Sequence, residues 1–185
     1  MNLTRAGSKL GVWLVVVAAG LVLSSAARAD FVKGLSLRAG IWTPSTSQSR
    51  DGVDFGAFSL GLEYELPFVP SLLNGEGWTT TLSVDFHYSQ RKVAVVRYVP
   101  VSINQVYSFS EQNGKVPYAG FSITAATMGA TDGTGHPTVT RWGGGLILGV
   151  KLNDKLKVET RYEWIEVHGA SWNVDGFRTY IGYKF

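Results

Sequence analysis

The chain contains no cysteine among its 185 residues. This excludes disulfide bonds, and it also excludes a lipid-modified cysteine at the start of an exported protein. After Leu23 the chain lacks any apolar run long enough for a membrane-spanning helix, which needs ~20 residues. Any later crossing of a membrane must therefore use β-strands, and strands satisfy their backbone groups in lipid only within a closed barrel.

The amino-terminal segment has the pattern of a signal peptide. Basic residues precede an apolar run, Leu10–Leu23, and small residues end at Ala29, which predicts cleavage before Asp30. The alternative is an uncleaved anchor helix, but the run is short for one. We therefore expect residues 1–29 to be a cleaved signal peptide and residues 30–185 to form one outer-membrane domain.

The charge balance gives no sign of a nucleic-acid partner. The chain has 17 basic and 14 acidic residues. Cleavage would remove Arg5, Lys9 and Arg28 but no acidic residue, so the two signs become equal in number. The basic character of the full chain therefore resides in its signal segment, and we expect no nucleic acid to bind.

After Asp30 the chain alternates apolar and polar side chains with the period of a β-strand. In the last strand, for example, Phe177 and Ile181 lie on one face while Arg178 and Lys184 lie on the other. We expect eight such strands: Gly34–Trp42, Asp54–Leu66, Trp78–Tyr88, Val93–Phe109, Val116–Thr127, Thr138–Leu152, Leu156–Val167 and Phe177–Phe185. The predicted fold is all-β, an eight-stranded antiparallel transmembrane β-barrel with up-and-down topology.

Two local signals refine this prediction. Pro100 cannot donate a hydrogen bond to a ladder, so it predicts a bulge in the fourth strand. Asn113-Gly114 is a strong tight-turn pair and predicts a hairpin between the fourth and fifth strands.

The competing fold is a soluble β-sandwich, which also shows alternation. The expected strands are long for a sandwich, and the inward phase carries full charges that a sandwich core does not tolerate. Large aromatic residues also stand near the strand ends, as in the interfacial girdles of membrane barrels: Trp42, Tyr64, Trp78, Tyr88, Tyr107, Trp142, Trp164 and Tyr183. These features favour the barrel.

Several segments together resemble the porin-family small outer-membrane barrels, of the outer-membrane protein A and X kind. They are Val99–Phe109, Pro117–Phe121, Trp142–Gly149, Lys157–Glu163 and the aromatic carboxy-terminus. The resemblance implies eight antiparallel strands, both termini in the periplasm and no cofactor. The spacing of the His and carboxylate residues separately predicts no metal site. The resemblance also implies that Tyr183 and Phe185 form the signal read by the barrel-assembly machinery. The expected partners are that machinery, outer-membrane lipid and lipopolysaccharide. The protein itself is expected to be a monomer.

One feature departs from this family pattern. Small barrels of this kind have short periplasmic turns, yet Pro67–Gly77 is long and falls on the periplasmic side. The next outer loop, Ser89–Lys92, is short instead. Either a small interfacial segment lies in Pro67–Gly77, or the register shifts near the third strand.

The inward phase predicts a luminal charge network. Its members have both signs, and buried charges persist only when paired, so we expect salt bridges that plug the lumen. The expected residues are Arg38, Glu63, Glu65, Asp85, His87, Arg141, Lys151, Lys157, Glu159, Arg161, Glu163, Arg178 and Lys184. The alternative is a narrow pore, because glycines leave interior space: Gly56, Gly61, Gly120, Gly143, Gly145, Gly149 and Gly182.

His87 and Ser89 raise the question of catalysis. A histidine and a serine two residues apart share a face of a strand, as in outer-membrane lipid A deacylases that use a His-x-Ser pair and a downstream Glu. The next carboxylate after them is Glu111, and both side chains are expected to point into the lumen, away from a lipid substrate. We therefore expect His87 to bond Asp85 or a neighbour, and we expect no enzyme activity.

The sequence leaves four functions open. A structural or envelope-integrity role is the first. A surface-binding role, such as that of an adhesin, would use the loops Thr43–Val53, Met128–Pro137 and His168–Val174, which are modest and without projecting strands. A small-solute channel and a lipid A-modifying enzyme are the remaining alternatives.

Overall fold

The computed structural model describes residues 32–45, 57–67, 76–91, 94–131, 138–165 and 174–185. The predicted signal peptide, Gly56 and most of the predicted loop residues lie outside these ranges. No helix in the described ranges is long and apolar enough to cross a membrane.

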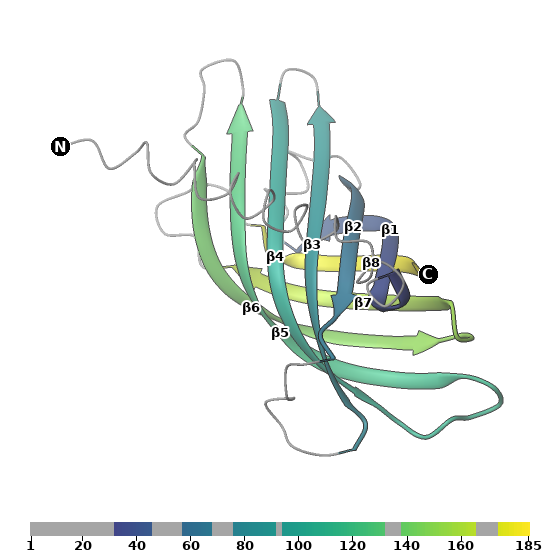
Figure 1. Ribbon diagram of the computed structural model, residues 1–185. Coiled ribbons are helices and arrows are strands. Elements are labelled where there is room, and N and C mark those ends of the chain that lie inside the picture. Colours follow the sequence, from purple (N-terminus) through teal and green to yellow (C-terminus); the bar gives the residue numbers. More distant parts are fainter. Residues whose placement is uncertain (1–31, 46–56, 68–75, 92–93, 132–137, 166–173) are drawn as a thin grey trace.

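Eight antiparallel strands form a closed barrel in which each strand pairs with its neighbours in sequence, and β8 pairs with β1 (Figure 1). The strands are β1 Leu35–Pro44, β2 Ala57–Glu65, β3 Trp78–Arg91, β4 Ala94–Ser108, β5 Val116–Thr131, β6 Val139–Lys151, β7 Leu156–Ile165 and β8 Gly176–Lys184. This confirms the predicted eight-stranded, antiparallel, up-and-down barrel. We call the end where β1 begins and β8 ends the terminal end, and the opposite one the loop end.

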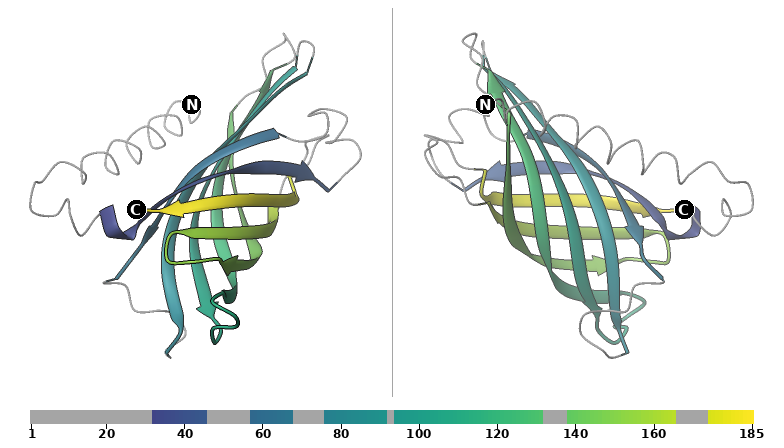
Figure 2. Two further views of the ribbon diagram at one scale, coloured as in Figure 1. Left: turned by 90° about the vertical axis from the view of Figure 1, so that its right-hand side faces the viewer. Right: turned by 60° about the vertical axis from the view of Figure 1, so that its left-hand side comes forward.

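The strands are unequal in length. β3, β4 and β5 have 14, 15 and 16 residues, whereas β1, β2, β7 and β8 have 9 or 10. At the loop end the β2–β3 ladder stops at Phe58–Tyr88, but the β3–β4 ladder continues to Arg91–Ala94. The ends of β3, β4 and β5 therefore project beyond the rest of the barrel (Figure 2). The expectation of no projecting strands is wrong.

Three local predictions can be compared with the strands. Asn113 and Gly114 have φ values of 52° and 74°, as a two-residue hairpin turn requires, which confirms the predicted turn. The predicted bulge at Pro100 is wrong, because the β3–β4 register is the same on both sides of this residue. The predicted loop Met128–Pro137 begins too early, since Met128–Thr131 continue β5.

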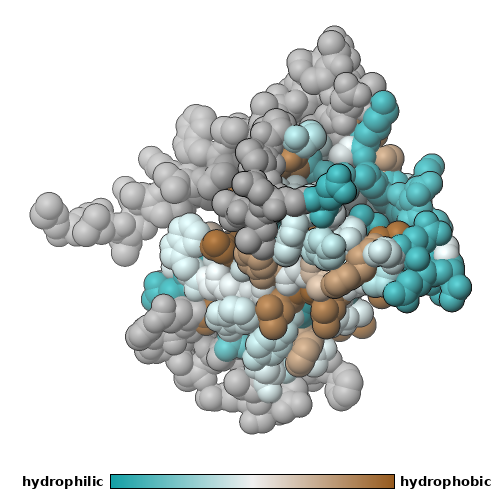
Figure 3. All heavy atoms as spheres, turned by 90° about the horizontal axis from the view of Figure 1, so that it is seen from below, coloured by the Kyte–Doolittle hydropathy of each residue, from teal (hydrophilic) through white to brown (hydrophobic). Residues whose placement is uncertain are grey.

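The outer surface of the barrel is apolar. Trp142, Leu148 and Ile181 are 69%, 65% and 63% exposed, and they lie on the outward face with Ile41, Phe58 and Leu146. Figure 3 shows apolar side chains across the described surface, with hydrophilic residues gathered at the terminal end on the right. Exposure of so much apolar area to water would be energetically unfavourable. In a lipid bilayer, the same apolar band is the normal outer surface of a β-barrel.

One aromatic assignment was wrong. Trp42 is 1% exposed and lies in the lumen, so it does not belong to an outer girdle. Its own period-two phase places it with Arg38 and Gly40 on the inward face of β1. Trp142 and Trp164, by contrast, are exposed on the outer face as expected.

Candidate functional site: the barrel lumen

Arg38 of β1 lies at the centre of the lumen and contacts carboxylates from other strands. Its Nε donates to Asp85 Oδ1 of β3 over 2.7 Å, and its Nη2 donates to the second oxygen of Asp85. Its Nη1 donates to Glu63 of β2 over 2.9 Å and to Glu159 of β7 over 3.3 Å. Because β1 has only β2 and β8 as neighbours, the contacts to Asp85 and Glu159 cross the lumen.

Arg161 of β7 extends this central cluster to β4 and adds a second contact to Glu63 of β2. Its Nη2 donates to Glu63 over 2.8 Å and its Nη1 to Asn104 Oδ1 over 3.1 Å, and its Nε pairs with Glu159. Lys157 of β7 pairs with Glu63 as well. Arg38 and Arg161 are at most 1% exposed, so their charges are removed from water and neutralised by carboxylates.

A second charged cluster lies next to the first, toward the loop end. Arg178 of β8 pairs with Glu163 of β7, and its Nη2 donates to the Tyr98 hydroxyl over 2.7 Å. Its guanidinium also lies 4.8 Å from the centroid of the Tyr98 ring. Here the strands β4, β7 and β8 are connected across the interior by one buried arginine.

An apolar cluster lies in the lumen beyond Arg178, toward the loop end. It consists of side chains from the loop-end parts of the strands: Trp42, Ala57, Tyr98, Ala126, Met128, Ile165 and Val174, with Val139 packed against it. The Trp42 and Tyr98 rings stack with centroids 5.6 Å apart. Each member of the cluster is at most 3% exposed.

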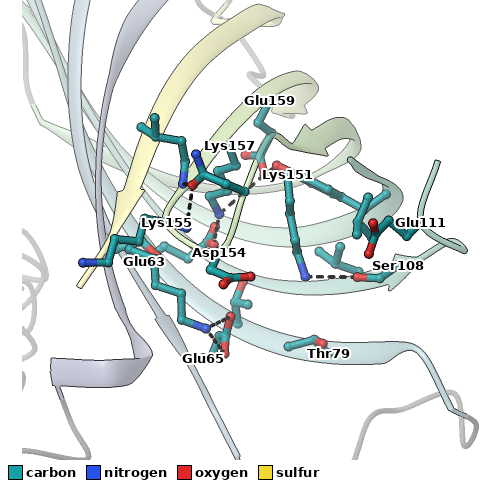
Figure 4. A pocket seen from close by; sticks show the side chains of 18 of the residues that line it. Glu63, Glu65, Thr79, Ser108, Glu111, Lys151, Asp154, Lys155, Lys157 and Glu159 are labelled. Carbon is teal, nitrogen blue, oxygen red and sulfur yellow. Dashed lines mark hydrogen bonds and ion pairs between the residues drawn. The ribbon is translucent and has the colours of Figure 1, made fainter. Parts of the chain in front are cut away.

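At the terminal end the lumen is open and forms a cavity of about 480 Å³ (Figure 4). We call it the vestibule. Lys184 Nζ donates to both oxygens of Glu65 over 2.8 Å, and Lys151 Nζ donates to Ser108 Oγ over 3.2 Å. The Tyr118 hydroxyl donates to Glu159 over 3.0 Å at the floor, where the vestibule meets the central cluster.

The structure thus places the predicted charges in layers. Arg38, Glu63, Asp85, Glu159 and Arg161 meet in the centre, Glu163 and Arg178 lie above them, and Glu65, Lys151 and Lys184 line the vestibule. His87 is luminal but joins no ion pair among the described residues. Arg141 follows the inward phase of β6 near the loop end and donates to the Thr140 carbonyl.

Three of the glycines that suggested interior space are packed against luminal side chains. A Cβ atom at Gly61 would collide with Asp85, one at Gly149 with the Tyr118 ring, and one at Gly182 with the Lys157 stem. Each of these glycines therefore accommodates a luminal side chain of an adjacent strand. The space that their missing side chains leave is occupied by these side chains.

His87 is hydrogen-bonded to Ser59 of β2, not to Asp85. Both residues are at most 1% exposed, and the His87 ring stacks on Tyr98 with centroids 5.1 Å apart. Asp85 is bound to Arg38 and does not orient the histidine. Ser89 belongs to β3, and its side chain lies outside what the structure describes. Within the described ranges, no cluster of His, Asp and Glu has the arrangement of a metal site.

Several luminal residues were missed from the sequence. Ser59, Tyr98, Tyr118 and Tyr180 are polar and buried, and they bond to or stack on the charged residues. Each has the inward phase of its strand, which was the available signal. The predicted network contained only ionisable acidic and basic residues and His87, so these hydroxyl side chains were left out of it.

Comparisons with known proteins give the same fold. No family model matches the chain, and no curated protein matches it. The crystal structure of Neisserial surface protein A is similar with a TM-score of 0.61 and 15% identity, over 82% of this chain and 96% of that one. The fold is that of the small outer-membrane barrels.

Two further structures support this assignment. The outer-membrane enzyme PagL matches with a TM-score of 0.55 and 12% identity, over 81% of this chain and 98% of PagL. The amino-terminal barrel domain of Pseudomonas aeruginosa OprF matches with a TM-score of 0.50 and 10% identity, over 84% of this chain and 99% of that domain. One of these structures is an enzyme, so the shared fold does not decide activity.

Proposed function

We propose that this chain is an integral protein of the outer membrane, with a barrel closed to solutes and a structural role in the envelope. The location is supported by the exposed apolar face and by the similarity to outer-membrane barrels. Closure is supported most directly by two arginines that join strands that are not neighbours in the barrel. Arg38 of β1 bonds to β3 and β7, and Arg161 of β7 bonds to β4. The apolar cluster at the loop end adds a second barrier.

Planar-bilayer recordings test the closed lumen. The wild-type barrel, purified in detergent and reconstituted, is expected to give no stable single-channel currents. The matched controls are a known porin, reconstituted in the same lipid, and vesicles without protein. Large, stable steps from the wild-type protein, which are absent from the protein-free vesicles, would refute closure.

We propose that the barrel has no catalytic role. His87 and Ser59 are enclosed by Trp42 and Tyr98 in the lumen, so a lipid substrate outside the barrel does not reach them. Mass spectrometry of lipid A from cells with the wild-type protein, with His87→Ala or without the protein is expected to give identical spectra. A lipid A species that depends on His87 would contradict this.

The partners follow from the outer face. Arg97 of β4 is exposed beside Tyr88 near the loop end, where its charge suits lipopolysaccharide phosphate. Tyr183 and Phe185 are exposed at the terminal end with ring centroids 5.4 Å apart, which suits recognition by the assembly machinery. No cofactor is required by this role.

A second candidate function is binding at the cell surface, as in an adhesin. The observation that favours it is the projection of β3, β4 and β5 at the loop end. Cells that carry a barrel with a shortened β3–β4 hairpin are expected to adhere less than wild-type cells. Unchanged adhesion counts against this function and leaves the structural role.

A further inference from the structure

The vestibule opens at the terminal end. The central charged cluster forms its floor, and the apolar cluster lies beyond that floor. Its volume of about 480 Å³ is in the range of small-molecule sites. Acidic and basic side chains both line it.

Lys151 and Lys157 stand directly opposite each other in the β6–β7 ladder. Like charges in this position destabilise a sheet. Lys157 is neutralised by Glu63, but Lys151 Nζ has one hydrogen bond, to Ser108 Oγ, and no carboxylate within ion-pair distance among the described residues. The Lys151 ammonium therefore faces the vestibule beside Lys157. Lys157 and Lys184 each pair with a glutamate, whereas Lys151 pairs with no described carboxylate.

Glu111 provides the opposite charge on the same wall. It lies in the turn between β4 and β5 and lines the vestibule with Lys151 and Ser108 (Figure 4). Within the described ranges Glu111 forms no ion pair, and neither does Asp154 of the β6–β7 turn. The vestibule thus presents an ammonium with a neighbouring hydroxyl donor and two carboxylates, none of them in an ion pair.

We propose that the vestibule binds a small zwitterionic molecule that carries a carboxylate and an ammonium group, such as a short peptide. The carboxylate accepts hydrogen bonds from Lys151 Nζ and Ser108 Oγ. The ammonium is held by Glu111, with Asp154 at the same mouth. The site goes beyond the structural role, because it accepts a ligand from the terminal side without passing it through the barrel.

Titration calorimetry of the full barrel in detergent micelles tests this site with three probes. They are trialanine, trialanine amide, which lacks the carboxylate, and N-acetyl-trialanine, which lacks the ammonium. Trialanine is expected to bind saturably, and each capped peptide is expected to bind about tenfold more weakly, as for loss of one charge-assisted contact. Absence of saturable trialanine binding overturns the proposal, and so does N-acetyl-trialanine binding as tightly as trialanine.

Variants then connect each ligand group to its residue. Lys151→Gln is expected to weaken trialanine about tenfold but to leave trialanine amide unchanged, because the amide already lacks the group that Lys151 holds. Glu111→Gln is expected to weaken the binding of trialanine but not of N-acetyl-trialanine. Because Glu111 is exposed, this substitution is expected to leave the fold intact. Lys115→Gln, on the same hairpin but outside the vestibule, is the matched control and is expected to bind as the wild type does.

Equal binding of trialanine by Lys151→Gln and wild type overturns the proposal. Heat-modifiable gel migration shows whether each variant is folded. If Lys151→Gln is not folded, Glu111→Gln replaces it, and unchanged trialanine binding by Glu111→Gln overturns the proposal. Conductance is measured in a separate experiment. A barrel that conducts no ions and binds no trialanine therefore refutes the vestibule site but not the proposed closed lumen.

Discussion

Buried arginines hold the interior of this barrel together at the scale of single residues. Arg38 donates to carboxylates of β2, β3 and β7, and its guanidinium also lies 4.7 Å from the centroid of the Tyr180 ring. A planar guanidinium with five N–H groups can serve several acceptors at once, whereas lysine is a single point charge. Arg38 therefore fixes the positions of three carboxylates that would otherwise repel one another.

Arg38→Met leaves those carboxylates buried without their shared partner. Breaking a buried ion pair in this way costs about 3–5 kcal/mol, so the variant is expected to unfold at a clearly lower urea concentration. The measurement is urea unfolding in detergent micelles, followed by gel migration. Arg97→Met is the matched control, because Arg97 is exposed on the outer face. A midpoint for Arg38→Met equal to that of the control would contradict the role of Arg38.

Gly61→Ala tests the packing of the glycines. The new methyl group would collide with Asp85 and Arg38, so we expect a destabilisation of about 1–3 kcal/mol. Gly129→Ala is the matched control, since its methyl group would meet Thr138 Oγ1 at 3.4 Å, which is close to ordinary contact. Equal unfolding midpoints for the two variants would show that the lumen has room at Gly61.

At the scale of strands, the period-two pattern predicted all eight elements, because lipid on one side and charge on the other enforce strict alternation. Strand ends were less predictable. Met128–Thr131 contain glycine and threonine and were assigned to a loop, yet Met128 is buried in the apolar cluster. Contacts between distant strands, such as Arg38 with Asp85, depend on the stagger of the closed barrel, which no single strand encodes.

The projecting hairpin is expected to be dispensable for the fold. The Gln90–Val95 and Arg91–Ala94 pairs connect β3 and β4 beyond the point where β2 ends. Deletion of Gln90, Arg91, Ala94 and Val95 removes two residues from β3 and two from β4. Because side chains alternate with a period of two, the remaining residues of both strands keep their inward or outward orientation. Heat-modifiable migration and the urea midpoint are expected to match those of the wild type. Loss of the folded band would show that the projection stabilises the barrel.

At the scale of the whole molecule, the two faces of the sheet divide the physical tasks. Apolar side chains on the outside suit hydrocarbon, while the lumen is filled by two charged clusters and an apolar layer at the loop end. This arrangement explains why a chain with many charges has an apolar exterior. The vestibule lies at the terminal end, next to the central charged cluster.

The most direct test of this account is fluorescence quenching by brominated lipid. Two single-tryptophan variants are reconstituted in vesicles, one with Trp142 only and one with Trp42 only, and phenylalanine replaces the other tryptophans. We predict strong quenching of Trp142, which is 69% exposed on the outer face, and little quenching of Trp42, which is 1% exposed in the lumen. Equal quenching of the two, or protection of Trp142, would contradict a barrel with a lipid-facing apolar exterior and a closed charged interior.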